Sequence, residues 1–394
     1  MSARQIPWRQ ALSARPSRRA LTSQASASAS TSTSTSAPSP FSSPRLHQTI
    51  TLPDGRALGF AEYGDPAGAP ILYFHGFPSS RLEAQPVASM LSLLGVRLIA
   101  LDRPGFGLSS PQPGRRIIDW AEDVRSFARG VGVDRFAVLG TSGGGPYALA
   151  CAHALPRNMV AGVGLFASGP PWEAGAQLMS RTRRVARAMA VRTPGEVVAR
   201  RIDKWFAAAA AAAEESDKTG TGTSDTKSEG VSKAESKGIA TEEETDRVAA
   251  IAAQREETLR IVLDEPFCQG ATAAVEELRL LSDPDWGFRL EDVAYDPVRI
   301  WHGAEDANAP IAAIRYLAER VPHAVLTEYS GDSHYTMAKY IEGAMGELLV
   351  DGGLVYSTRT ECGIITAWNW RRHGGAAQAD LALGSRRAAS PTKV

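Results

Sequence analysis

Cysteine is scarce in this chain of 394 residues. The three cysteines, Cys151, Cys268 and Cys362, lie far apart and show no paired CxxC spacing. Such a set is too sparse for a disulfide framework and has the wrong spacing for a zinc site. The sequence therefore predicts no metal centre and favours a reducing compartment.

Long apolar runs and an excess of one charge are also missing. No run of about 18 uncharged apolar residues is present, so the sequence predicts no transmembrane segment. Basic and acidic residues are equal in number, at 43 each. Beyond the arginines that precede Asp54, the chain carries 37 basic against 43 acidic residues. A mildly negative body without a basic stripe argues against nucleic-acid binding.

Acidic residues are absent from residues 1–45, which are rich in Arg, Ser, Thr and Ala. This bias is typical of organelle transit peptides. The alternative is a plain disordered extension, because the Ser, Ala and Thr run over 26–36 has little apolar surface to pack. We therefore exclude residues 1–45 from the fold. Mitochondrial localisation is the expectation, and a cytoplasmic one is its alternative.

Short apolar runs alternate with helical periodicity from Gln48 onward, which is typical of an α/β domain with a parallel sheet. We assign residues 46–170 and 286–350 to this core. Its predicted strands cover 50–52, 58–63, 71–74, 96–101, 136–139, 160–166, 298–301 and 324–328. Helical periodicity runs over 82–94, 117–131 and 335–349.

Strand signals stop between residues 171 and 285, where the pattern is helical over 176–190, 194–213, 245–263 and 271–281. This stretch predicts a separate helical layer inserted into the core. Residues 207–244 within it combine an alanine run with a Gly, Ser, Thr, Lys and Glu tract, and we interpret them as a low-complexity insert. The tail over 351–394 has no periodicity and is expected to be disordered.

Ser142 lies in a glycine-rich turn between a predicted strand and a predicted helix, the setting of a nucleophile elbow. Such a turn strains its central residue and tolerates only small neighbours two positions away on each side. Those neighbours are Gly140 and Gly144. The pattern predicts Ser142 as a nucleophile, with a glycine turn devoid of chemistry as the alternative.

A serine nucleophile needs an imidazole to take its proton and a carboxylate to orient that imidazole. After an elbow of this kind the acid comes first and the histidine second. His334 follows the last predicted strand, whereas His153, His302, His323 and His373 have structural explanations or lie in the tail. Asp306 follows the preceding strand and is the predicted acid. Glu305 is an alternative, and Glu173 and Asp332 are weaker ones.

Acyl transfer also needs backbone donors for the oxyanion. The sequence offers the amide of Gly143, directly after the nucleophile, and that of Phe77, in the loop after the strand 71–74. His75 precedes Ser142 and is interpreted as a loop-fixing residue. The GxG over 105–107 lacks the third glycine, at 110, of a dinucleotide site, so a structural turn is favoured there.

Five segments in this order resemble the α/β-hydrolase superfamily: HGFPSSR at 75–81, DRPGFGLS at 102–109, GTSGGGP at 140–146, WHGAEDANAP at 301–310 and GDSH at 331–334. The resemblance covers roughly residues 48–350. It implies an α/β-hydrolase fold with a mostly parallel eight-stranded sheet, an inserted helical cap, and no metal or organic cofactor. Members with aspartate at the elbow are dehalogenases and epoxide hydrolases, and Ser142 argues against both.

The resemblance implies a serine hydrolase with a small-molecule acyl substrate, most simply a carboxylic ester cleaved through an acyl-enzyme on Ser142. Peptidase, amidase, thioesterase and C–C hydrolase are alternatives within the fold. A ligand-binding protein with an idle triad is an alternative from another class. The insert over 207–244 and the 44 residues after 350 depart from the usual family pattern.

Overall fold

The computed structural model describes residues 43–195, 197–200 and 264–354. The predicted extension up to residue 42, the insert over 207–244, the helical segment over 245–263 and the tail from 355 onward lie outside the described residues. Residues 43–45, which we assigned to the extension, and residues 351–354, which we assigned to the tail, belong to the folded unit: a helix runs to Asp351, and Leu354 is buried. Arg45 donates from Nη1 to the carbonyl oxygen of Gly64 at 3.2 Å.

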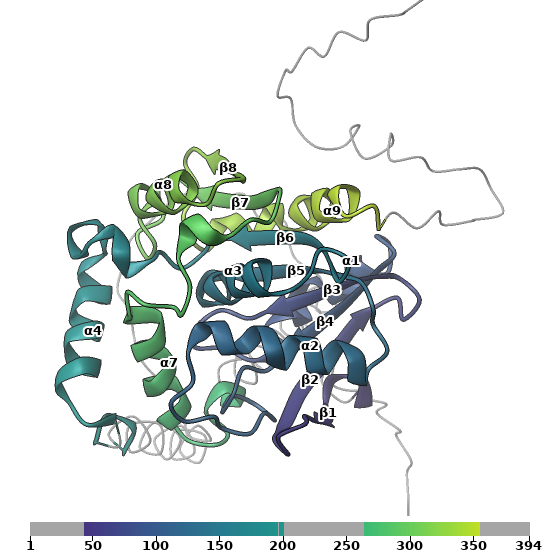
Figure 1. Cartoon of the computed structure of the whole chain (residues 1–394), viewed down its shortest axis with the longest axis horizontal. Helices are drawn as coiled ribbons and strands as arrows, with labels where there is room; N and C mark the ends of the chain where they lie inside the picture. Colours follow the sequence, from purple (N-terminus) through teal and green to yellow (C-terminus); the bar gives the residue numbers. More distant parts are fainter. Residues whose placement is uncertain (1–42, 196, 201–263, 355–394) are drawn as a thin grey trace, which may run out of the picture. The chain divides into compact units, whose positions relative to one another are not determined.

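Eight strands form one sheet within the described residues, in the order β1-β2-β4-β3-β5-β6-β7-β8 (Figure 1). β2 pairs antiparallel with β1 and β4, and every other neighbouring pair is parallel. This confirms the predicted α/β fold with a mostly parallel eight-stranded sheet. The strands are β1 Gln48–Thr51, β2 Ala57–Gly64, β3 Ala69–Phe74, β4 Val96–Leu101, β5 Phe136–Thr141, β6 Val160–Phe166, β7 Val298–Gly303 and β8 Ala324–Tyr329.

Helices connect the parallel strands, as a parallel sheet requires. The α-helices of the described part of the chain include α1 Ala88–Leu91, α2 Trp120–Gly130, α3 Gly145–Ala154, α4 Arg181–Arg192, α7 Thr272–Ser282, α8 Ile311–Arg320 and α9 Ile341–Asp351. The 3₁₀ helices are Pro44–Leu46, Arg81–Val87, Ile117–Asp119, Ser142–Gly144, Trp172–Ala174, Ala176–Leu178, Glu265–Phe267, Leu290–Asp292 and Thr336–Tyr340. α4 and α7 come from the stretch inserted between β6 and β7, and they pack against each other (Figure 1).

The continuous helix predicted over 82–94 is wrong. The chain forms the 3₁₀ helix Arg81–Val87, and the four-residue α1 follows it. Pro86 lies inside this segment. Proline has no amide hydrogen to donate and its ring clashes with the preceding turn, so an α-helix cannot run through the segment undisturbed.

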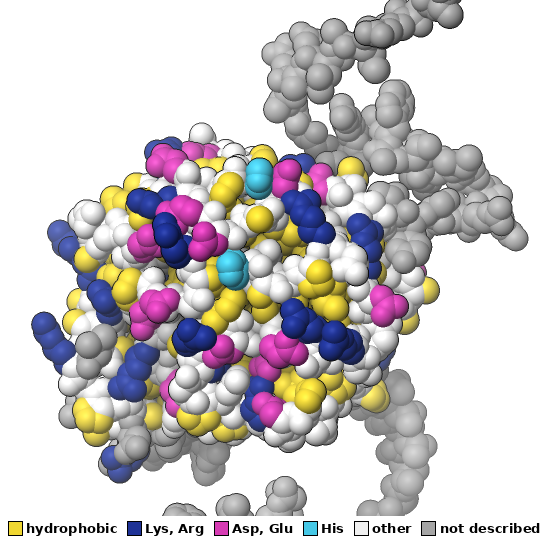
Figure 2. Space-filling view, viewed as in Figure 1, with side chains coloured by type: hydrophobic (Ala, Val, Ile, Leu, Met, Phe, Trp, Pro, Cys, Tyr) yellow, Lys and Arg dark blue, Asp and Glu magenta, His cyan; other side chains and the backbone are white. Residues whose placement is uncertain are grey.

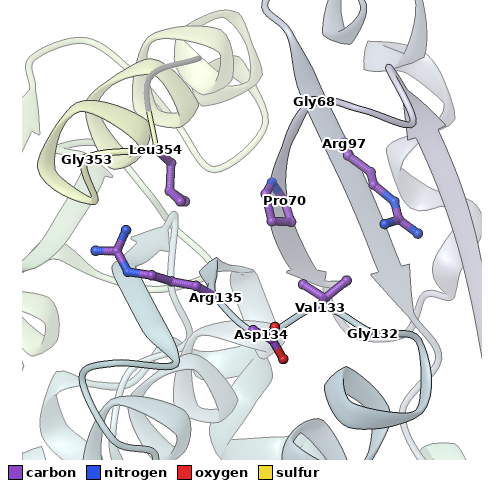
Figure 3. Close-up of a pocket in the computed structure, with 9 residues that line it drawn as sticks. All are labelled: Gly68, Pro70, Arg97, Gly132, Val133, Asp134, Arg135, Gly353 and Leu354. Carbon is purple, nitrogen blue, oxygen red and sulfur yellow. The ribbon is translucent and has the colours of Figure 1, made fainter.

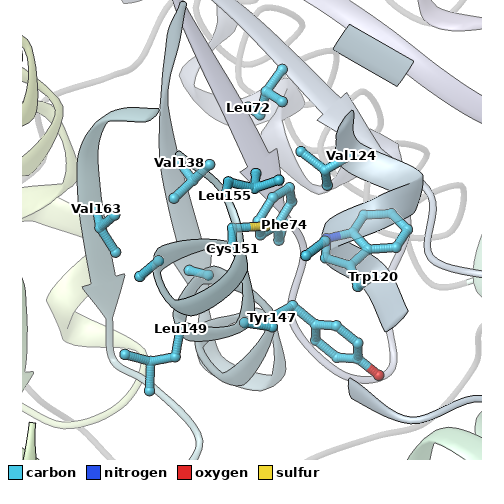
Figure 4. Close-up of a cluster of buried hydrophobic side chains, with 14 of the residues drawn as sticks. Leu72, Phe74, Trp120, Val124, Val138, Tyr147, Leu149, Cys151, Leu155 and Val163 are labelled. Atoms are coloured by element: carbon cyan, nitrogen blue, oxygen red, sulfur yellow. The ribbon is translucent and has the colours of Figure 1, made fainter. Parts of the chain in front are cut away.

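The main core lies where α2 and α3 cover the sheet (Figure 4). Phe74 of β3 and Trp120 of α2 are buried and make an edge-to-face contact, with ring centroids 5.5 Å apart. Cys151 is fully buried beside them, and burial raises the pKa of its thiol. The labelled members of this cluster are Leu72, Phe74, Trp120, Val124, Val138, Tyr147, Leu149, Cys151, Leu155 and Val163.

The register of β3 and β5 decides where their loops meet. Phe74, the last residue of β3, pairs with Gly140 of β5. Because the strands are parallel, the chain leaves both at the same edge of the sheet, and the loop over 75–78 meets the turn that contains Ser142. Open α/β sheets place their sites at this carboxyl edge.

Candidate active site

Ser142 has a backbone φ of 47°, in the left-handed region that a residue with a side chain rarely adopts. The flanking glycines allow the turn to close. A Cβ added to Gly140 would lie 2.3 Å from the carbonyl oxygen of Gly144, and one added to Gly144 would lie 2.0 Å from that of Phe74. Both distances are far inside van der Waals contact, so only glycine fits at either position.

Three predicted site residues form one chain of hydrogen bonds. His334 Nε2 lies 3.0 Å from Ser142 Oγ, and His334 Nδ1 lies 2.6 Å from Asp306 Oδ2. Since an ionised carboxylate only accepts, the partners assign the ring proton to Nδ1 and leave Nε2 to accept from the serine hydroxyl. The structure thus brings together Ser142, His334 and Asp306, which come from loops after β5, β8 and β7.

Asp306 is held as a buried carboxylate. Its Oδ1 accepts from the amides of Asn308 and Ala309, each at 2.8 Å. Its Oδ2 lies 3.2 Å from His302 Nε2 as well as close to His334. Burial alone would raise the pKa of Asp306, but the hydrogen bonds from both histidines and the backbone outweigh it and hold that pKa well below its usual range.

The three alternatives to Asp306 as the acid, Glu305, Glu173 and Asp332, lie in different environments. Glu305 and Glu173 are exposed. Asp332 accepts from Thr336 and Tyr340, and it lies 2.7 Å from Lys339 Nζ. Among these four carboxylates, Asp306 is the one in contact with His334.

The remaining histidines lie apart from Ser142 or outside the described residues. His302, for which sequence reasoning found only a structural role, lies behind Asp306 and donates from Nε2 to the carbonyl oxygen of Ala309 at 2.8 Å. His153 stacks on Phe288. His323 precedes β8 at the opposite end from His334. His373 lies outside the described residues.

The two predicted oxyanion donors adjoin each other. A Cβ added to Gly143 would lie 3.3 Å from the amide nitrogen of Phe77, and one added to Gly76 would lie 3.4 Å from Ser142 Cβ. Gly143 is in the first turn of a helix, where amides have no partner within the helix. The loop after β3 and the elbow therefore present neighbouring backbone amides beside the serine, an arrangement that suits an oxyanion.

Glu83 is a site residue that sequence reasoning missed. Its carboxylate accepts from the amide of Gly76 at 2.8 Å, from the Tyr73 hydroxyl at 2.6 Å and from the Thr141 hydroxyl at 2.7 Å. It therefore ties the loop that carries Phe77 to the residue directly before Ser142. No local sequence pattern predicts this role, because the partners of Glu83 come from β3, the loop after it and β5.

A second buried network joins α7 to the same loop. Arg103 donates to the carbonyl oxygens of His75 and Gly76, and from Nε to Glu277 of α7 at 2.7 Å. Arg115 and Tyr147 also donate to Glu277, each at 2.7 Å. Burial opposes ionisation of Glu277, but the two arginines outweigh it and lower its pKa. α7 and the loop after β3 are thus joined through a fully buried ion pair.

His75 fixes this loop rather than contacting the serine. Its Nδ1 donates to the carbonyl oxygen of Gly76 at 2.8 Å, and its Nε2 accepts from the amide of Arg103 at 3.2 Å. Burial and the charge of Arg103 hold the pKa of His75 well below its usual value. The ring is neutral and has a partner on each nitrogen.

The segment with the GxG pattern is a turn around a buried ion pair. Asp102 accepts from the Arg81 guanidinium at 2.9 Å and from the amide of Leu108 at 2.9 Å. Gly107 has a φ of 48°, and a Cβ there would lie 2.2 Å from Asp102 Oδ2. The second glycine of the pattern is thus needed for close packing on a carboxylate.

A pocket of about 540 Å³ lies at the opposite edge of the sheet (Figure 3). Pro70 and Arg97 line it near the amino ends of β3 and β4, and Arg135 lines it just before β5. Ser142 follows the other end of β5, so this pocket is separate from the candidate site.

Positive and negative side chains are interspersed over the face shown in Figure 2.

Within residues 43–195, 197–200 and 264–354, no group of three His, Cys, Asp or Glu side chains is placed to hold a metal ion. Among the helices of this part of the chain, none is both long and apolar enough to cross a bilayer.

Comparison with known sequences places the chain in a family. The model of the alpha/beta hydrolase fold family matches residues 69–338. A pimeloyl-[acyl-carrier protein] methyl ester esterase from Aromatoleum aromaticum is 46% identical over 57 residues, which are 14% of this chain and 22% of that protein. The bifunctional esterase/perhydrolase DCH of Acinetobacter calcoaceticus is 32% identical over 126 residues, 31% of this chain and 45% of that protein. The chain spans less than half the length of either of these curated relatives.

Solved structures show the same fold at low sequence identity. A hydrolase from Pseudomonas aeruginosa PA01 superposes with a TM-score of 0.52 at 16% identity, covering 78% of this chain and 98% of that one. An esterase from Exiguobacterium antarcticum gives 0.50 at 16% identity, covering 77% and 98%. By its sequence match over residues 69–338, with the fold in agreement, the chain belongs to the alpha/beta hydrolase fold family.

Proposed function

We propose that this protein is a serine hydrolase that cleaves carboxylic esters through an acyl-enzyme on Ser142. The observation that carries the proposal is the pair of contacts made by His334, to Ser142 Oγ on one side and to Asp306 on the other. The esterase names of two relatives support an ester as the substrate.

In the acylation step, Ser142 Oγ attacks the ester carbonyl carbon while His334 Nε2 takes the hydroxyl proton. Asp306 accepts from His334 Nδ1 throughout and stabilises the imidazolium that forms. The oxygen that becomes negative is stabilised by the amides of Phe77 and Gly143. His334 then gives its proton to the leaving alcohol, and the acyl group stays on Ser142.

In the deacylation step, His334 Nε2 takes a proton from water, and the resulting hydroxide attacks the acyl carbon. The same two amides stabilise the second oxyanion. His334 returns the proton to Ser142 Oγ as the C–O bond to the serine breaks. The carboxylic acid leaves, and the enzyme is restored.

Labelling by a fluorophosphonate probe tests the nucleophile directly. We expect the wild type to be labelled and Ser142→Ala to be unlabelled. His334→Ala should label at least about a thousandfold more slowly, because the serine then has no base. An unlabelled wild type would support the ligand-binding alternative, and equal labelling of Ser142→Ala would refute the assignment of the nucleophile.

A panel of p-nitrophenyl esters of increasing chain length, with matched anilides and thioesters, tests the substrate class. We expect hydrolysis of the esters to exceed that of the anilides and thioesters of the same acyl group. Faster turnover of anilides would point to the peptidase or amidase alternative, and faster turnover of thioesters to the thioesterase.

A further inference from the structure

Arg183, on α4, reaches the candidate site from the inserted helical stretch. Its Nε donates to the carbonyl oxygen of Asn308 at 2.8 Å, two residues after Asp306. A Cβ added to Gly169 would lie 3.7 Å from Arg183 Nη2, 3.3 Å from the carbonyl oxygen of Ser142 and 3.8 Å from Gly143 Cα. The guanidinium and the nucleophile elbow therefore border the same small space.

The outer donors of this guanidinium are unused. Within the described residues, Nε has a hydrogen-bond partner, whereas Nη1 and Nη2 have none and no carboxylate forms an ion pair with them. The nearby carboxylate of Asp306 is already taken up by His334, His302 and backbone amides. A guanidinium held near a site with both Nη groups free is suited to the bidentate binding of a carboxylate.

Arg183 is half-buried. The side chain retains part of its solvent-accessible surface. The surrounding protein nevertheless lowers its pKa to about 10, although the charge of Asp306 opposes this shift. Arg183 is still cationic at neutral pH. A poorly hydrated cation of this kind gains more from an anionic partner than a cation on the open surface does.

We propose that Arg183 binds a carboxylate of the substrate, so that the preferred substrates are esters carrying a second, free carboxylate, such as monoesters of short dicarboxylic acids. This inference rests on the proposed function, because it places the scissile ester at Ser142. Arg183 acts here as a specificity-determining residue: its charge selects the anionic ester and takes no part in the transfer of the proton.

Monomethyl glutarate and dimethyl glutarate form a matched pair of substrates, since they differ by one masked carboxylate. We expect the wild type to have the higher kcat/KM for the monoester. Arg183→Met should lower kcat/KM for the monoester about tenfold more than for the diester, mainly through KM, because a charge-assisted pair is lost. Arg184→Met removes an exposed arginine from the next position of α4 and should leave both values unchanged.

Two results would overturn the inference. One is an equal fall on both substrates in Arg183→Met, which would mean that the arginine only positions the loop around Asn308. The other is a wild type without preference for the monoester. If fluorophosphonate labels Ser142 while either result holds, this inference fails and the proposed function stands.

Binding can be measured without turnover in Ser142→Ala. We expect millimolar glutarate to raise the Tm of Ser142→Ala and to leave the Tm of Ser142→Ala/Arg183→Met unchanged. The monoamide of glutarate, which has one carboxylate, should act like glutarate, whereas the neutral diamide should have no effect. A Tm shift that survives loss of Arg183 would place the anion elsewhere and refute the assignment.

Discussion

Glu277 offers the sharpest test of how the inserted helices are fixed to the core. The substitution Glu277→Ala removes the carboxylate that accepts from Arg103, Arg115 and Tyr147. Glu277 and Arg103 have no solvent-accessible side-chain surface, and Arg115 has 4%. The substitution therefore leaves two buried guanidinium groups without their shared counter-charge.

Removing one partner of a buried ion pair costs about 3–5 kcal/mol, because the remaining charge stays out of water. A domain typically has about 5–15 kcal/mol of stability in total. Glu277→Ala should thus lower the free energy of unfolding by about 3–5 kcal/mol, a large share of the whole. Exposed ion pairs on the surface have no comparable effect.

Urea unfolding followed by tryptophan fluorescence measures this change, and Glu276→Ala is the matched control. Glu276 is the preceding residue of α7, so helix propensity changes by the same amount, but it is half-buried and outside the ion pair. We expect the control to remain close to the wild type. Equal losses in the two variants, or a loss below about 1 kcal/mol for Glu277→Ala, would refute the reasoning.

Four further predictions concern the site and the amino-terminal segment. Asp306→Asn should lower the free energy of unfolding by its full amount above about pH 5 and by progressively less below it. The pKa of the native carboxylate is lowered, so its contribution to stability declines once pH falls below the unfolded value of about 3.9 and is lost only as pH falls through the lower native value. Unfolding at pH 7, 5 and 3 measures this, and a constant difference would contradict it. Gly144→Ala should abolish fluorophosphonate labelling, because its Cβ would lie 2.0 Å from a carbonyl oxygen, and a labelled Gly144→Ala would show that the turn can relax. The control is Gly346→Ala in α9, whose Cβ would meet no atom within 4 Å. This control should stabilise the fold by about 0.5–1 kcal/mol in urea unfolding. Glu83→Gln should lower kcat on p-nitrophenyl butyrate about tenfold with little change in KM, because the charged acceptor for the amide of Gly76 is lost; an effect confined to KM would place Glu83 in binding instead. Residues 1–45 fused to a fluorescent protein should direct it to mitochondria, and a diffuse cytosolic signal would contradict that proposal.

Much of the sheet was predictable because its signals are local. A buried parallel strand is a continuous apolar run, and β4 and β6 have the bounds expected from their runs. The helix predicted over 82–94 is wrong for an equally local reason, since Pro86 lies within the apolar periodicity and has no amide hydrogen to donate. Apolar periodicity indicates which face of a helix is apolar. It does not indicate whether each backbone amide can donate a hydrogen bond.

The candidate site likewise contains residues that the sequence predicts and contacts that it does not predict. The elbow around Ser142 is specified by a few consecutive residues, and His334 and Asp306 follow strands in a predictable order. Glu277 and Arg103 are 174 positions apart, and no pattern in the sequence pairs them. Contacts of that kind depend on how α7 packs against the loop after β4, so the sequence alone does not reveal the partners of the carboxylate.

The link between α7 and the loop after β3 also bears on how the proposed ester substrate would reach Ser142. Lifting α7 would separate Glu277 from Arg103 and withdraw Leu281, whose Cδ1 would lie 3.1 Å from a Cβ on Gly143. It would also deprive Arg103 of the carboxylate that orients it toward the carbonyl oxygens of His75 and Gly76. Under the proposed function, we therefore expect a substrate to reach Ser142 and a product to leave it while α7 stays in place. α7 thus contacts the nucleophile elbow through Leu281 and also holds, through Glu277, the arginine that fixes the loop after β3.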